Sequence, residues 1–153
     1  MNYEDFTVGQ EYQKTVHVTQ DQIDAFAQVS GDHNPLHTDP EFARKSIFGQ
    51  TVAHGMLGLS LISAVLGTEF PGFGTIYMGQ EAKFFRPIFT DESVRIRLRV
   101  KELQPEKKRM LITTTILKEN DEIAIDGEAR VQYNPALFVE KDDPAENLAS
   151  VVS

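Results

Sequence analysis

The stretch from residue 53 to residue 70, AHGMLGLSLISAVLGTEF, constrains the fold more than any other part of the chain. Its apolar residues fall on every side of a helix: Met56, Leu57, Leu59, Leu61, Ile62, Val65 and Leu66. Such a helix is usually buried over most of its surface, and this one is too short to span a bilayer. We therefore expect the rest of the chain to cover it, and we expect the helix to end at Gly67.

The second half of the chain has the pattern of β-strands. The segment SVRIRLRVKEL alternates apolar with basic residues, which is typical of a strand with one buried face and one wet face. Four further strands are expected at residues 11–19, 75–89, 109–118 and 122–133, the last with Ile123, Ile125, Ala129 and Val131 on one face. These patterns predict an α+β fold, with an antiparallel sheet of about five strands wrapped around the long central apolar helix.

Two shorter helices are predicted before the apolar one. Thr19 and Gln22 have the spacing of a capping box, and an apolar stripe follows them as far as Gly31. Asp39 followed by Pro40 is a strong signal for the start of the second helix.

Length and composition narrow the class of protein. The 153 residues suffice for one domain, which we place at residues 1–134, with a C-terminal tail at 135–153. The net charge of −8 argues against a nucleic-acid partner, and the absence of cysteine excludes disulfides and thiolate chemistry. The N-terminus lacks the pattern of a secretory signal, so we expect a cytoplasmic protein that does not enter a membrane.

The segment SGDHNPLHTDP, residues 30–40, raises the question of catalysis. Pro35 stiffens it, so Asp32 and His37 could be held at one water molecule for general acid–base work. The alternative is an ordinary turn, because Asp and Asn readily bond their own backbone. Spacing alone favours the turn, and it makes His33 a solvent-facing or packing residue.

The segment VAHGM, residues 52–56, offers a second possible element of a site. Gly55 at the start of the apolar helix would leave backbone N–H groups free to bind a developing oxyanion. The alternative is that His54 caps a core helix and Gly55 only relieves packing. Ser60 and Ser63 would either bond to a helix carbonyl or orient Asp32 in a pocket. No metal is expected, because Pro35 separates His33 from His37 and no zinc motif is present.

Taken together, these segments resemble the MaoC-like, (R)-specific enoyl-CoA hydratases. The resemblance rests on Ser-Gly-Asp-x-Asn-Pro-Leu-His, on Val-Ala-His-Gly-Met and on the segment YMGQEAKFFRPIFTDESV, and it covers roughly residues 6–133. It implies a hot-dog fold, a homodimer, and the addition of water to a trans-2-enoyl-CoA without a cofactor. It implies catalytic roles for Asp32, His37, Gly55 and Ser63, and substrate-binding roles for Asn34, His54, Met56 and Gly79.

Two other activities remain open beside the hydratase. One is a 3-hydroxyacyl-ACP dehydratase, although an acidic protein should attract an acidic carrier poorly. The other is a hot-dog acyl-CoA thioesterase, which would attack the thioester carbonyl and release a thiol. A non-catalytic acyl-CoA-binding subunit is the third possibility, but the acid and the histidine are both present.

Overall fold

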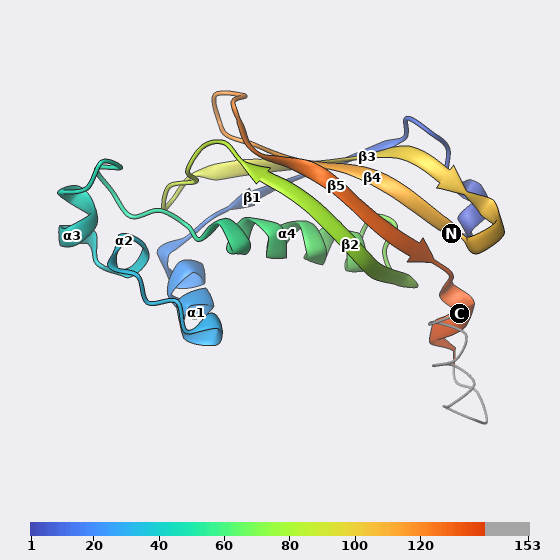
Figure 1. The fold of residues 1–153 in the computed structure, drawn as a ribbon, viewed down its shortest axis with the longest axis horizontal. Coiled ribbons are helices and arrows are strands. Elements are labelled where there is room, and N and C mark those ends of the chain that lie inside the picture. Colours follow the sequence, from blue (N-terminus) through green and yellow to red (C-terminus); the bar gives the residue numbers. More distant parts are fainter. Residues whose placement is uncertain (140–153) are drawn as a thin grey trace.

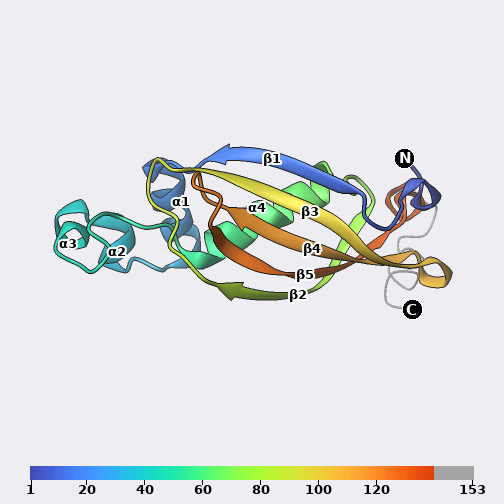
Figure 2. The same ribbon diagram turned by 90° about the horizontal axis from the view of Figure 1, so that it is seen from above.

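The computed structural model describes residues 1–139 and shows one antiparallel sheet with the strand order β1-β3-β4-β5-β2 (Figures 1 and 2). Its strands are β1 (Glu11–His17), β2 (Thr75–Phe84), β3 (Ser93–Gln104), β4 (Arg109–Leu117) and β5 (Ile123–Tyr133). The first and second strands of the chain therefore form the two edges of the sheet. The strand β1 pairs with β3, from Glu11 opposite Arg99 to His17 opposite Ser93.

The apolar helix α4 (Gly55–Thr68) lies along one face of this sheet (Figure 1). Gly58 lets the helix approach the strands closely, since a Cβ there would lie 2.5 Å from Ile125 Cδ1. One turn further on, Ile62 is completely buried. The predicted α+β fold, with a five-stranded antiparallel sheet packed on an apolar helix, is therefore confirmed. The expectation that the chain covers this helix on most sides is wrong for the described residues, because Met56, Ser60 and Ser63 lie on an exposed face.

Three helices lie together beyond one end of the sheet (Figure 1). They are α1 (Gln20–Ser30), α2 (Pro35–Thr38) and α3 (Pro40–Arg44). The predicted caps are present: Thr19 and Gln22 form the capping box of α1, and Asp39 accepts hydrogen bonds from the first backbone amides of α3. Short 3₁₀ helices occupy Tyr3–Asp5, Pro105–Lys107 and Pro135–Phe138.

The structure corrects several predicted boundaries. The strand β2 ends at Phe84, five residues before the predicted end at 89. The helix α4 continues through Gly67 to Thr68, and Gly67 does not adopt a positive φ. Ile123 is 39% exposed rather than buried, because the register of β4 and β5 shifts beside it and Ala124 points into the core.

The division of the chain into a domain at 1–134 and a tail stays a prediction. The tail begins with the 3₁₀ helix at Pro135–Phe138, and residues 140–153 lie outside the described residues. Within residues 1–139, no helix is both long and apolar enough to cross a membrane.

Candidate active site

Three polar side chains from separate segments meet at the start of α4. They are Asp32 in the loop after α1, His37 in α2, and His54 immediately before α4, and one donor atom from each lies within 4.8 Å of the others. The imidazole rings of His37 and His54 stack with centroids 3.8 Å apart. Asp32 is exposed, His37 is half-buried, and His54 is only 3% exposed.

A hydrogen bond to a backbone carbonyl defines the tautomer of His37. Its Nδ1 lies 2.7 Å from the carbonyl oxygen of Val52, which can only accept, so Nδ1 carries the proton and donates it. In the neutral ring, Nε2 is then left with a free lone pair. His37 is thus arranged as a proton acceptor at Nε2.

His54 is held in a similar way by the loop that carries Asp32. Its Nε2 donates to the backbone carbonyl oxygen of Asp32 at 3.0 Å. Its Nδ1 is buried and has no hydrogen-bond partner among the described residues. Phe26 of α1 packs on the other side, with ring centroids 4.9 Å apart. His54 therefore ties the loop that carries Asp32 to the ring of His37.

The start of α4 has no side-chain cap. The carbonyl of Thr51, one turn before Gly55, accepts a hydrogen bond from Thr90 instead of from the helix. The N-terminal amides of a helix carry partial positive charge and bind anions. A Cβ at Gly55 would lie 2.7 Å from the ring of Phe84, so no other residue fits there without moving that ring.

The loop before α2 is built by the turn chemistry that the sequence suggested. The Asp32 carboxylate accepts a hydrogen bond from the Asn34 amide at 3.2 Å, and Asn34 Oδ1 accepts one from the Leu36 amide at 3.0 Å. His33 is exposed. The turn and the acid–base pair are therefore compatible, because the turn is what brings Asp32 to the histidines.

The other predicted site residues line a separate, more open hollow. Met56, Ser60, Ser63 and Gly79 line about 600 Å³ between α4 and β2, together with Phe26 and Tyr77. Burial raises the pKa of Tyr77 above its ordinary value. Ser60 donates to the carbonyl of Leu57, while within residues 1–139 no hydrogen bond joins Ser63 to Asp32. The supporting role of Ser63 and the substrate-binding roles of Met56 and Gly79 stay predictions.

A second hollow, of about 340 Å³, opens on the other side of the first turn of α4. Its wall includes His54, Gly55 and Phe84, and the aromatic rings of Phe48 and Phe85. Gly55 thus lines this largely apolar hollow, and the next residue, Met56, lines the first one. Such a place suits a ligand with a polar reacting group and an apolar chain.

The trio Asp32, His37 and His54 also has the donor types that bind divalent cations. The sequence indicated only His33 and His37 as a possible ligand pair, and it implied a substrate-binding role for His54 without placing it beside His37. The predicted absence of a metal stays a prediction.

The basic run from Arg95 to Lys101 lies on the outer face of β3. The alternating residues Val94, Ile96, Leu98 and Val100 are fully buried on the opposite face, which α4 covers. Arg95 pairs with Asp121 and Lys101 pairs with Glu128. This run is therefore the solvent-facing side of β3, as the alternation predicts, and it lies on the face of the sheet opposite α4.

Comparisons with known proteins identify the chain's relatives. Residues 5–122 match the family described as MaoC like domain. A 3-hydroxybutyryl-CoA dehydratase of Methylorubrum extorquens is 36% identical over 96% of this chain and 89% of that protein. An (R)-specific enoyl-CoA hydratase of Aeromonas caviae is 37% identical over 86% of this chain and 98% of that protein. The unliganded R-hydratase PhaJ1 of Pseudomonas aeruginosa superposes with a TM-score of 0.83 at 37% identity, over 86% and 84% of the two chains.

Proposed function

The chain belongs to the MaoC-like domain family, and from that premise we propose that it is an (R)-specific enoyl-CoA hydratase. It would add water to a trans-2-enoyl-CoA and give the (R)-3-hydroxyacyl-CoA. The predicted family and the hydratase/dehydratase type of enzyme are confirmed by the relatives. The observation that carries the proposal is the meeting of Asp32 and His37 beside the uncapped start of α4.

In this mechanism, one substrate water lies between Asp32 and His37. The free lone pair of His37 Nε2 takes a proton from the water as its oxygen attacks the β-carbon of the enoyl group. The Asp32 carboxylate accepts a hydrogen bond from the other O–H of the water and orients it, and that hydrogen stays on the oxygen as the product hydroxyl. His37 then returns its proton to the α-carbon from the same face, so the addition is syn and no proton is gained or lost.

The electrons of the double bond move to the thioester oxygen during the attack. The Gly55 amide, at the positive end of α4, stabilises the resulting enolate. The chemistry needs no change of oxidation state, so the proposal includes no redox cofactor. It includes no metal, because acid–base groups and an amide at the thioester oxygen suffice for hydration. The acyl chain would lie against the apolar walls on either side of α4.

The test is the loss of the enoyl thioester's ultraviolet absorbance, with crotonyl-CoA as substrate and chiral analysis of the product. Asp32→Asn and His37→Gln should each lower kcat by about 10²–10⁴-fold, the range for general acid–base groups. His33→Gln is the matched control, because His33 lies between the two residues in the sequence but does not belong to the trio that meets at the start of α4. An inactive wild type on every enoyl thioester would refute the activity, and an unchanged Asp32→Asn would refute the mechanism.

The same assay separates the alternatives. A thioesterase would release free thiol from the substrate, which a thiol-trapping reagent detects, whereas hydration releases none. A dehydratase for carrier-bound substrates would prefer acyl carrier protein thioesters over CoA thioesters at equal concentration. The net charge of −8 favours CoA over an acidic carrier.

The proposal includes a homodimer formed along β2. This strand pairs only with β5 among the described strands, so its other edge has free backbone groups. Large apolar side chains around it are exposed: Met56, Tyr77, Met78, Phe84 and Phe85. Light scattering should give twice the chain mass of 17.2 kDa, and Met78→Glu should shift the protein toward the monomer. A wild type that is monomeric at all concentrations would refute the dimer.

A further inference from the structure

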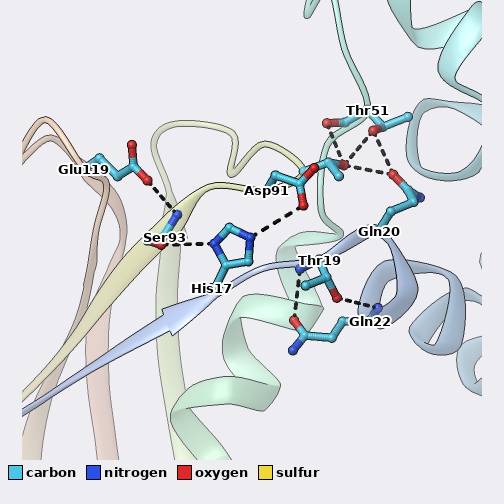
Figure 3. A network of polar contacts seen from close by, with 9 residues as sticks. His17, Thr19, Gln20, Gln22, Thr51, Asp91, Ser93 and Glu119 are labelled. Atoms are coloured by element: carbon cyan, nitrogen blue, oxygen red, sulfur yellow. Dashed lines mark hydrogen bonds and ion pairs between the residues drawn. The ribbon is translucent and has the colours of Figure 1, made fainter.

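Gln20, the first residue of α1, has an amide whose four hydrogen-bonding positions are all occupied. Its Nε2 donates to the backbone carbonyl oxygen of His37 at 2.8 Å and to Asp24 Oδ1 at 2.9 Å. Its Oε1 accepts from the hydroxyl of Thr51 at 2.9 Å (Figure 3) and from that of Thr90, also at 2.9 Å. The orientation of this amide is therefore fixed from both sides.

These contacts close a circuit around His37. Gln20 holds the backbone carbonyl of His37, while the ring of His37 donates to the carbonyl of Val52. Val52 follows Thr51 in the chain, and the hydroxyl of Thr51 returns to Gln20. The Val52 amide also donates to the carbonyl of Leu36, at 3.1 Å. Hydrogen bonds therefore connect both the backbone and the imidazole of His37 to the same short segment, residues 51–52.

We propose that Gln20 is a positioning residue for His37, which holds its imidazole at the distance from Asp32 that the reaction requires. The inference rests on the proposed function, because the catalytic role of His37 belongs to that proposal. It adds a residue outside the family motif on which the catalytic assignments were based.

The contacts explain why this position needs glutamine. The amide donates to the His37 carbonyl and accepts from Thr51 and Thr90 with one planar group. Glutamate has the same shape and keeps the acceptor, but it places a carboxylate against the carbonyl of His37. Leucine removes both functions and leaves the buried hydroxyl of Thr51 without this acceptor.

Gln22 provides a matched control on the same turn of α1. Its Oε1 accepts a hydrogen bond from the Thr19 amide at 3.3 Å as part of the capping box (Figure 3). It is exposed, and among residues 1–139 it makes no hydrogen bond to His37 or to residues 51–52. Replacing it disturbs the start of α1 without touching the circuit around His37.

The experiment compares Gln20→Leu, Gln20→Glu and Gln22→Leu in steady-state kinetics with crotonyl-CoA. We expect both Gln20 variants to lower kcat by about 10–100-fold, as expected when a group that orients a catalytic side chain is lost. The KM should stay within about threefold of wild type, because the substrate contacts are unchanged while the reacting geometry is lost. Gln22→Leu should keep the wild-type kcat at a temperature where all variants are folded by circular dichroism.

Each outcome decides the inference. Near-wild-type kcat in both folded Gln20 variants would overturn it, and so would an equal fall in Gln22→Leu, since that would mean that only the stability of α1 matters. If Gln20→Leu does not fold, the isosteric Gln20→Glu decides alone. An inactive wild type would overturn the proposed function itself, which separates that failure from a failure of the role of Gln20.

Discussion

The close approach of α4 to the sheet at Gly58 gives a quantitative prediction. Gly58→Ala places a methyl group 2.5 Å from Ile125 Cδ1 and 3.5 Å from Ile116 Cδ1 in a fully packed layer. Gly67→Ala, near the end of the same helix, meets nothing within 4 Å. Both substitutions therefore raise helix propensity, but only Gly58→Ala also forces a methyl group into the packed core. Comparing the two variants isolates the cost of packing.

The magnitudes follow from these distances. Replacing a helical glycine by alanine gains up to about 1 kcal/mol, and we expect Gly67→Ala to stabilise the protein by this amount. Forcing an extra methyl into a packed core costs about 1–3 kcal/mol. For Gly58→Ala the cost exceeds or cancels the gain, so its free energy of unfolding should lie about 1–3 kcal/mol below that of Gly67→Ala.

Urea unfolding followed by circular dichroism measures this difference directly. The variants must be compared at one protein concentration, because the midpoint of a dimer depends on it. Equal m-values would show that the unfolded states are comparable. The reasoning fails if Gly58→Ala is as stable as Gly67→Ala or more stable, since the helix would then not be packed against Ile125 as described.

Three further predictions concern stability. Lys118→Met should lower the free energy of unfolding in urea by about 3–5 kcal/mol, because it leaves the Glu92 carboxylate buried without its ion-pair partner. The double variant Glu92→Gln/Lys118→Met should recover most of this loss. No recovery would contradict the ion-pair explanation. Gly127→Ala should cost more than about 3 kcal/mol, since its Cβ would lie 1.9 Å from the Glu81 carbonyl oxygen; Gly79→Ala, with no atom closer than 4.0 Å, is the control. Burial raises the pKa values of Tyr3, Tyr77 and Tyr133 above 10.0 in the folded protein. The stability that these neutral tyrosines contribute is therefore complete below pH 10 and is lost as the pH rises through their folded-state pKa values. The free energy of unfolding should fall between pH 9 and 11.5, and a constant value over that range would refute this prediction.

The parts of the fold that are encoded locally could be predicted from the sequence. The capping box at Thr19 and the alternation of β3 depend only on neighbouring residues, and both are present as expected. The missed helix α2 was also encoded locally: Asn34 before Pro35 is the same cap-and-proline signal as Asp39 before Pro40. A single helical turn that begins at Pro35 and ends just before Pro40 has the same sequence pattern as a loop.

The parts of the site that depend on long-range contacts could not be predicted. His54 reaches His37 because the neighbouring Ala53 amide bonds to the carbonyl of Ile88, far along the chain. Gln20 contacts His37 and Thr90 across separations of 17 and 70 residues. No periodicity or spacing encodes such contacts. The motifs indicated Asp32, His37 and His54, but neither the stacking of His54 on His37 nor the contacts of Gln20 could be predicted.

The strand order has a consequence for the protein's synthesis. The strand β1 cannot pair until β3 has been synthesised. The helix α4 is complete at Thr68, before most of the sheet that packs on it has been made. At ~5–20 residues per second, the ribosome needs about 3–13 seconds to pass from Thr68 to the end of β5 at Tyr133. During those seconds the nascent chain carries a helix that is apolar on all sides and has no sheet to pack against. Slow translation between α4 and β5 would therefore lengthen the period in which this chain is most prone to aggregate.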